Sequence, residues 1–458
     1  MTQRKTSEQR QRMLETPVYR LVPSLALPST IGMLITSIYN MADTFFVSRL
    51  GTSATGAVGV VYSLMAVIQA VGFMLGMGSH SLVARHLGAK EQEKANATAS
   101  VGFFAALAFG LMLTVAGSLF RTELVDLLGA SDTMLEDARQ YATYILYSAP
   151  LMCACFQMNN VLRAEGNAAL GTCAMTAGGI LNMILDPVFI FLLDFGVAGA
   201  ALATALSQSV SFCILLFMYW SGRSSIRLNI RYLKGNLSLL RNIITTGLPS
   251  LCRQGLTSLA SVCLNRSVRP YGDAALAAIS IVSRIIQFLG RLAIGFGQGS
   301  QPVVGYSFGA KRYSRVYETV RFSVVSITGV MALLATMVFL WAPELISLFQ
   351  KDAQVIAIGT LGLRLNCLTA PLCGLYNTVT MSMQVLGKSR PSTFLSSCRQ
   401  GLFYLPLLAL FSGLFGLTGI QAAQPAADVL MFLLALVYFI RLRKELMTLA
   451  EAQLKLAV

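Results

Sequence analysis

Long apolar segments recur along this chain of 458 residues, and they constrain its fold more than any other feature. A segment of about 18 or more predominantly apolar residues is long enough to cross a bilayer as a helix. A helix also satisfies its own backbone hydrogen-bonding groups inside the hydrocarbon, which an open strand does not. Charged residues make up only 12% of the chain, against about 25% in a soluble domain. The sequence therefore predicts an all-α membrane protein and excludes a soluble enzyme.

The apolar segments predict twelve transmembrane helices. An even number of helices places both termini on the same side of the membrane, and the basic loops identify that side as the cytoplasm. The predicted helices cover residues 21–48, 54–84, 97–119, 136–162, 168–193, 197–220, 238–266, 275–307, 319–341, 355–386, 391–411 and 417–440.

Lys and Arg are concentrated in alternate loops. The formal net charge is +15, yet the intervening loops are acidic or neutral, as in residues 123–137. This is the positive-inside pattern, so the charge indicates orientation and contact with anionic lipid rather than nucleic-acid binding. We expect a multi-pass protein of a cell membrane (the bacterial inner or the plasma membrane). The basic loops are residues 4–20, 85–94, 223–241, 311–321, 388–390 and 441–444.

An internal repeat relates the two halves of the chain, and its members differ in residue number by a constant shift of 221. The shared positions are mostly Gly and Pro: Leu27-Pro28 recurs as Leu248-Pro249, Gly51 as Gly272, Gly88-Ala89-Lys90 as Gly309-Ala310-Lys311, and Gly166 as Gly387. Such a repeat predicts two six-helix bundles related by a pseudo-two-fold axis along the membrane normal. We divide the chain into a cytoplasmic N-terminus (1–20), an N-lobe (21–220), a cytoplasmic linker (221–237), a C-lobe (238–440) and a cytoplasmic C-terminus (441–458).

Carboxylates inside the first bundle mark a candidate cation site. Asp43 shares a face of the first predicted helix with Asn40, and Asp186 of the fifth helix follows Asn182 by one turn. A charged Asp near the middle of the bilayer costs about 2.5–3.5 kcal/mol, so it is expected to face protein or water. With Thr204 of the sixth helix, these side chains offer oxygens that suit a proton or a hard cation such as Na⁺. The alternative is a purely structural pairing between helices.

The predicted helices of the second half carry several arginines and, apart from Asp428, no acid. At the shift of 221, Asp43 corresponds to Leu264 and Asp186 to Leu407, and Asp428 is predicted to be either a second cation site or a partner of a neighbouring helix. Guanidinium groups suit a cavity wall that binds carboxylate or phosphate, whereas the alternative is arginines that snorkel to the membrane surface. The expected substrate-cavity residues of both halves are Tyr39, Gln69, Gln157, Asn160, Gln254, Arg284, Gln287 and Arg291.

Four motifs resemble those of the MATE (multidrug and toxic compound extrusion) transporters. They lie at Tyr39–Gly51, Arg163–Asn167, Asn182–Pro187 and Gly297–Lys311, and the resemblance spans residues 20–440 approximately. It implies drug/cation antiport, with a site on the first, fifth and sixth helices that binds H⁺ or Na⁺. By position, the resemblance implies coupling roles for Asp43, Asn182, Asp186, Thr204 and the Ala200 carbonyl. Asn40 joins these candidates because it shares a helical face with Asp43. For Na⁺, the ligands would be Asp43, Asn182 and Thr204.

The expected function is secondary active multidrug efflux by alternating access, with drug-like, mostly cationic and amphipathic substrates. The alternative is a flippase or exporter of an anionic or lipid-linked metabolite, which the arginines of the second half motivate. An intramembrane enzyme is disfavoured, because the sequence has only two His and no recognisable nucleophile–base motif. We expect a small-molecule substrate, a lipid bilayer environment, no nucleic-acid partner, a monomer, and no cofactor beyond the coupling ion.

Overall fold

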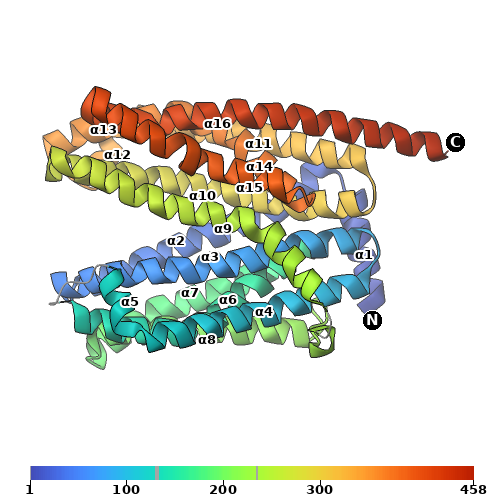
Figure 1. Cartoon of the computed structure of the whole chain (residues 1–458), viewed down its shortest axis with the longest axis horizontal. Helices are drawn as coiled ribbons and strands as arrows, with labels where there is room; N and C mark the ends of the chain where they lie inside the picture. The colour runs from blue at the N-terminus through green and yellow to red at the C-terminus, as the bar shows by residue number, and fades with distance from the viewer. Residues whose placement is uncertain (1, 129–133, 234–235, 458) are drawn as a thin grey trace. The chain divides into compact units, whose positions relative to one another are not determined.

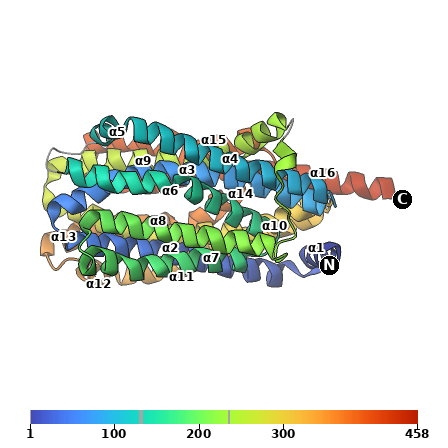
Figure 2. The same ribbon diagram turned by 90° about the horizontal axis from the view of Figure 1, so that it is seen from below.

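The computed structural model describes residues 2–128, 134–233 and 236–457, and within these ranges the chain forms helices and no strand. Long helices run side by side in each half (Figure 1), and the turned view shows the same packing (Figure 2). The helices of the first half are α1 (Thr2–Glu15), α2 (Val18–Ser48), α3 (Thr52–Gly88), α4 (Gln92–Leu119), α5 (Arg121–Leu127), α6 (Leu135–Ala164), α7 (Ala168–Pro187), η1 (Val188–Leu192), α8 (Gly196–Trp220) and η2 (Ile230–Leu233).

The second half has the same kind of architecture. Its helices are α9 (Leu237–Val268), η3 (Arg269–Tyr271), α10 (Asp273–Gly309), α11 (Tyr313–Leu340), α12 (Ala342–Ser347), α13 (Ala353–Thr369), η4 (Ala370–Leu372), α14 (Cys373–Val385), α15 (Ser389–Ser397), η5 (Cys398–Tyr404) and α16 (Leu405–Ala457).

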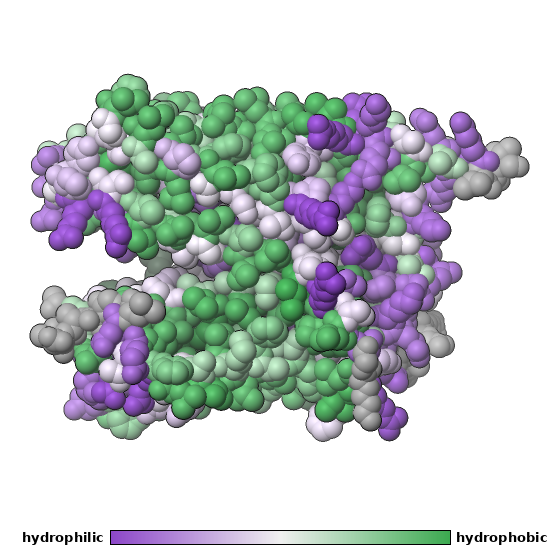
Figure 3. Space-filling view, in the orientation of Figure 1, coloured by the Kyte–Doolittle hydropathy of each residue, from purple (hydrophilic) through white to green (hydrophobic). Residues whose placement is uncertain are grey.

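The predicted twelve-helix membrane fold is confirmed. Within the described residues, nine helical stretches are long and apolar enough to span a membrane. The more polar helices α6 and α9 add two spans of 30 and 32 residues. The stretch Ser389–Gln453 provides two spans rather than one, because Gly416 interrupts it with φ 58° and ψ −135°. On the face shown in Figure 3, hydrophobic residues cover the middle of the helices and hydrophilic residues gather at their ends.

The chain forms two compact units, and each unit contains the beginning of one helix that continues in the other unit. The first unit contains the residues up to Glu15 and Ile31–Leu251, and the second contains Thr16–Thr30 and the residues from Cys252 onward. Helix α2 therefore begins in the second unit and ends in the first, whereas α9 does the reverse. The two crossing points are related by the shift of the sequence repeat, and each follows a helix-interior proline, Pro28 or Pro249.

The repeat is also visible in the backbone. Eight of the ten described residues with positive φ form four pairs, and three of these pairs are separated by the predicted shift of 221. A positive φ is uncommon for a residue other than Gly, and it recurs in position here because equivalent turns join equivalent helices. The pairs are Gly51 (116°) with Gly272 (89°), Lys90 (65°) with Lys311 (61°), Gly166 (86°) with Gly387 (80°), and Gly196 (54°) with Gly416 (58°).

Glycines allow equivalent helices to cross closely inside each unit. In the second unit, a Cβ at Gly299 would lie 2.2 Å from the Cα of Ala26, so α10 and the beginning of α2 touch backbone to backbone. In the first unit, a Cβ at Gly78 would lie 2.0 Å from the carbonyl oxygen of Ile243, at the beginning of α9. Small residues permit this close approach between membrane helices. Gly78 and Gly299 are themselves equivalent positions of the repeat.

A buried carboxylate ties the end of α6 to the segment that follows α8. Glu165 is fully buried, and its Oε1 accepts a hydrogen bond from Ser224 Oγ at 2.5 Å. Its Oε2 accepts from the backbone N–H and the hydroxyl of Ser225 at 2.7 and 2.9 Å. Burial raises the pKa of the Glu165 carboxyl to about 7, although the three hydrogen bonds oppose the shift. Helix α1 lies at the same end, where Gln9 donates to Asn167 at 2.9 Å.

Candidate functional site

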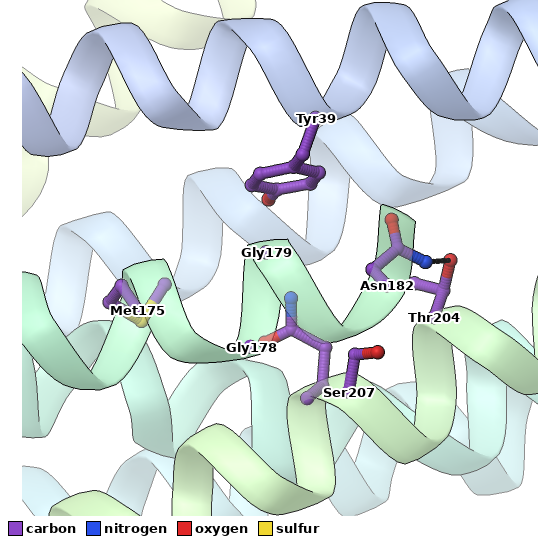
Figure 4. Close-up of a pocket in the computed structure, with 8 residues that line it drawn as sticks. Tyr39, Met175, Gly178, Gly179, Asn182, Thr204 and Ser207 are labelled. Atoms are coloured by element: carbon purple, nitrogen blue, oxygen red, sulfur yellow. Dashed lines mark hydrogen bonds between the residues drawn. The ribbon is translucent and has the colours of Figure 1, made fainter. Parts of the chain in front are cut away.

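The candidate cation site is built on the last two turns of α7. Small residues earlier in this helix bring its neighbours close: a Cβ at Gly179 would lie 2.9 Å from the Tyr39 ring of α2, and one at Gly178 would lie 1.8 Å from Ser211 Oγ of α8. The close approach of α2 and α8 allows side chains from three helices to meet at Asn182 and Asp186. Figure 4 shows Tyr39 lying over Gly179, and Asn182 directed toward Thr204.

Asn182 connects the two other polar groups of this cluster. Its Nδ2 donates to Asp186 Oδ1 at 3.0 Å and to Thr204 Oγ1 at 3.3 Å. All three side chains are buried, with exposed fractions of 3%, 0% and 7% for Asn182, Asp186 and Thr204. The second carboxylate oxygen of Asp186, Oδ2, is buried and accepts no hydrogen bond from the described part of the chain. An unsatisfied buried oxygen is costly and is a place where a proton or a cation would be stabilised.

Asp43 brings a second carboxylate from α2. It is half-buried, and its Oδ1 has no hydrogen-bond partner among the residues that the structure describes. Asp43 lies close enough to Asp186 for the two carboxylates to interact electrostatically. Tyr141 of α6 completes the surroundings, since its buried side chain lies near Thr204 and interacts electrostatically with both acids. The predicted convergence of acids from two helices is thus present in the structure.

The chain leaves regular α-helical geometry after Pro187, one residue beyond Asp186. Pro187 has no N–H, so the carbonyl of residue 183 loses its helical donor. The following segment, η1 (Val188–Leu192), is π-helical. Short π-helical segments are rare and occur frequently at functional sites.

The pocket beside these residues is small. Its volume is about 10 Å³, which is room for about one water molecule and far below the roughly 300–1,000 Å³ of a drug site. It therefore has the size for an ion or a water molecule and not for a drug. Its lining comes from α2, α7 and α8 and consists of Tyr39, Met175, Gly178, Gly179, Asn182, Thr204, Ser207 and Gln208.

The remaining predicted residues of the first half differ in how far their side chains are buried. Ala200 is fully buried one turn before Thr204, while Asn40 and Gln69 are half-buried. Gln157 and Asn160 are buried in contacts between helices: Gln157 donates to the Ala99 carbonyl at 3.0 Å, and Asn160 accepts from Arg163 at 2.5 Å. Tyr39 lines the small pocket, and the other cavity assignments stay predictions.

In the second unit, the predicted cavity residues lie along α9 and α10. Arg284 and Gln287 are exposed, and Gln254 and Arg291 are half-buried. Asp428 is 6% exposed and forms an ion pair with Arg399, whose Nε lies 2.8 Å from Oδ1. The interpretation of Asp428 as a partner of a neighbouring helix is therefore the one that the structure supports.

Sequence reasoning missed two residues near the site. Tyr141 looks like an ordinary helix residue in the sequence, because nothing there reveals which face of α6 lies against α7 and α8. Ser207 follows Thr204 by three residues, and this helical spacing was the available signal.

Comparisons with known proteins match this chain along most of its length. The MatE family profile matches residues 28–188 and 249–410, two segments whose first residues are related by the shift of the internal repeat. The multidrug export protein MepA of Staphylococcus haemolyticus is 27% identical over 433 residues, which cover 94% of this chain and 95% of that protein.

Solved structures also match over nearly the whole length. The outward-facing conformation of a multidrug resistance MATE family transporter of the MOP superfamily gives a TM-score of 0.90 at 25% identity, and the match covers 96% of this chain and 98% of that one. A MOP superfamily transporter from Pyrococcus furiosus, described as having a binding pocket of reverse polarity that suggests a different function, gives 0.88 at 26% identity with the same coverage.

Proposed function

Because the chain belongs to the MATE family of membrane transporters, we propose that it is a secondary active multidrug efflux transporter. It exchanges drug-like, mostly cationic and amphipathic compounds for H⁺ or Na⁺ by alternating access. Relatives named for multidrug export match this chain along nearly their full length, and this match supports the substrate class. The coupling ion binds in the first unit, at the cluster of Asp43, Asn182, Asp186 and Thr204.

One observation carries this proposal: two carboxylates from different helices lie in electrostatic contact, and each has a buried oxygen without a partner among the described residues. Two ionised carboxylates close together in a low dielectric repel one another. A bound proton or Na⁺ removes this repulsion and satisfies a free oxygen. The site therefore binds one small cation more readily than it tolerates being empty.

Either cation fits the side chains present. A proton would be held by Asp43 or Asp186, with Asn182 keeping one oxygen of Asp186 oriented by its hydrogen bond. Na⁺ prefers oxygen ligands, which Asp43, Asn182 and Thr204 supply, with the Ala200 carbonyl as a further ligand. The small pocket has no room for a drug, so the drug binds elsewhere and is coupled to the ion through a conformational change.

Helix α2 provides the connection for that change. Asp43 lies on its final turns in the first unit, and residues 18–30 of the same helix belong to the second unit. Cation binding alters the electrostatic balance around Asp43 and hence the preferred position of α2. Ion and drug then favour different conformations, and each shifts the population away from the other.

Efflux of ethidium from vesicles tests the proposal, with a pH gradient and a Na⁺ gradient imposed separately. Wild type is expected to drive efflux with at least one gradient, and Asp43→Asn and Asp186→Asn are expected to lose gradient-driven efflux. Asp126→Asn is the matched control, because Asp126 is an exposed residue of the short helix α5. Unchanged efflux in both site variants, at equal protein level, would remove the carboxylate pair from the mechanism.

A second candidate is export of an anionic or lipid-linked metabolite. The arginines of the second unit favour it, because they outnumber the acid that lies beside them. Membrane helices rarely keep charged residues without a function. We do not propose an enzymatic reaction, since the family is one of transporters.

A further inference from the structure

The second unit contains an excess of positive charge within its helices. Arg253 lies on α9, Arg291 on α10 and Arg399 in η5, and Arg253 is close enough to both other arginines for their charges to repel. Asp428 of α16 is the carboxylate that pairs with this cluster. Three guanidinium groups beside one carboxylate leave two positive charges uncompensated. Such an arrangement inside a membrane protein costs free energy unless an anion is bound.

Arg399 is held in place by several contacts. Its Nε donates to Asp428 Oδ1 at 2.8 Å and its Nη2 approaches Oδ2 at 3.5 Å. Gln424, one turn before Asp428 on α16, donates to the same Oδ1 at 2.9 Å. The guanidinium group also lies over the Tyr376 ring, with Cζ 4.9 Å from the centroid. Arg399 is thus oriented before any ligand arrives, which lowers the entropy cost of binding.

Arg253 and Arg291 are different, because neither has an ion-pair or hydrogen-bond partner for its side chain among the described residues. Both are half-buried rather than extended into solvent. Close packing holds α9 against η5 at this level: a Cβ at Gly401 would lie 3.2 Å from the Leu256 side chain, one turn after Arg253. By contrast, Arg364 donates to the Phe339 carbonyl at 3.3 Å. Arg253 and Arg291 therefore differ from Arg364 and Arg399, whose guanidinium groups are held by partners within the described chain.

We propose that Arg253, Arg291 and Arg399 form a binding site for an anionic oxygen group, a carboxylate or a phosphate, carried by an amphiphilic molecule. The guanidinium fork matches two oxygens of either group. Arg253 and Arg291 bind the anion, and Asp428 with Tyr376 fixes Arg399 as the third side of the site. The proposal deepens the second candidate function by naming the group recognised, and binding to purified protein tests it independently of transport.

Binding of dansyl-labelled undecanoic acid to the purified full-length protein tests this site. The methyl ester of the same probe is the control ligand, because it lacks the carboxylate charge. Wild type in phosphatidylcholine nanodiscs is expected to bind the acid more tightly than the ester. The double variant Arg253→Gln plus Arg291→Gln is expected to weaken binding of the acid by about tenfold or more and to leave ester binding unchanged. Arg253→Lys plus Arg291→Lys keeps the charge without the fork and is expected to be intermediate. Arg266→Gln is the matched control, since Arg266 is exposed on the same helix as Arg253.

Two competition arms separate the sources of the anion. Displacement of the probe by dodecyl phosphate in phosphatidylcholine nanodiscs supports a free amphiphile as the ligand. Displacement by phosphatidylglycerol built into the nanodisc supports a lipid headgroup. Equal binding of acid and ester by wild type would overturn the proposal. So would unchanged acid binding in the double Gln variant, provided that its thermal unfolding matches that of the Lys variant.

Discussion

Asn182 Nδ2 donates to Oδ1 of Asp186 at 3.0 Å, so an uncharged amide orients a carboxylate that has no cationic partner in the described chain. The same nitrogen lies 3.3 Å from Thr204 Oγ1. This places the hydroxyl and the carboxylate around one donor and leaves the second oxygen of Asp186 unsatisfied by the described residues. An amide, unlike an arginine, does not neutralise the acid, and the acid therefore retains its affinity for a cation.

Asn182→Ala removes the donor that orients both oxygens. A lost hydrogen bond that leaves buried acceptors unsatisfied costs about 1–3 kcal/mol, so we expect lower thermal stability. The concentration of coupling ion that gives half-maximal ethidium efflux should also rise, because the ligands are no longer pre-oriented. Ser209→Ala on α8 serves as control, since its hydroxyl donates to the Ala205 carbonyl of its own helix and, within the described chain, makes no bond to another helix. The same half-maximal ion concentration in Asn182→Ala and wild type would argue against this role.

Gly299→Ala tests the close helix crossing in the second unit. The added Cβ would lie 2.2 Å from the backbone of Ala26, so the helices must separate, and we expect a loss of stability of about 1–3 kcal/mol. Gly329→Ala is the same substitution at an exposed position of α11 with no atom within 4 Å. It should be neutral or slightly stabilising, because Ala favours helix. Melting temperatures in detergent measure both, and equal values would contradict the crossing geometry.

Gly272→Ala isolates the cost of backbone conformation. Gly272 has φ +89°, and a Cβ at this position would meet no atom within 4 Å, so strain alone opposes a side chain. With ψ 175°, Gly272 lies in a region of backbone conformation that is essentially restricted to Gly. We expect a loss of about 1–3 kcal/mol in the free energy of unfolding. Gly272→Asn should lose a similar amount, because Asn tolerates the left-handed helical region and not this one. Chemical denaturation measures both variants, and wild-type stability in either would show that the position is not strained.

Glu165 gives the protein a pH-dependent stability. Its pKa is raised to about 7 in the folded state, against an ordinary value of about 4.3, so the folded protein binds this proton more tightly than the unfolded chain. Stability from this group is fully present below about pH 4.3 and is lost as the pH rises through about 7. Glu165→Gln should flatten this part of the profile, as measured by melting temperatures between pH 5 and pH 8.

The control for that measurement is Glu93→Gln, an exposed residue at the start of α4. It should retain the wild-type difference between acid and neutral pH, because its carboxyl is in solvent. An unchanged pH profile in Glu165→Gln would mean that Glu165 keeps its proton, or loses it, equally in both states.

The sequence predicted the large-scale architecture well, because a membrane requires long apolar helices and these are easily recognised in a sequence. Apolar length determined the helices, and Gly and Pro positions revealed the repeat that recurs in the positive φ angles of residues such as Gly166 and Gly387. The sequence also identified Asp43, Asn182, Asp186 and Thr204 as candidates for one site, because acids within apolar segments are costly in a membrane and therefore indicate a function.

Other features depend on packing that a single sequence does not encode visibly. Tyr141 reaches the acids only because α6 presents one particular face to α7 and α8. The pairing of Asp428 with Arg399 requires η5 and α16 to lie together, and the sequence left two roles open for Asp428. The polar N-terminus forms helix α1, and π-helical turns follow Pro187 and Ser397. Periodicity gives no signal for either feature.

The central claim is that Asp43 and Asp186 act as one cation site, and a double-mutant cycle of gradient-driven efflux tests it most directly. Initial ethidium efflux rates would be measured for wild type, Asp43→Asn, Asp186→Asn and the double variant at equal protein density in vesicles. If the two acids share one ion, the efflux rate of the double variant is no lower than that of the slower single variant, because either substitution alone already abolishes the shared ion site. Losses that instead multiply, with each acid contributing the same factor whether or not the other is present, would show two independent groups and contradict the account.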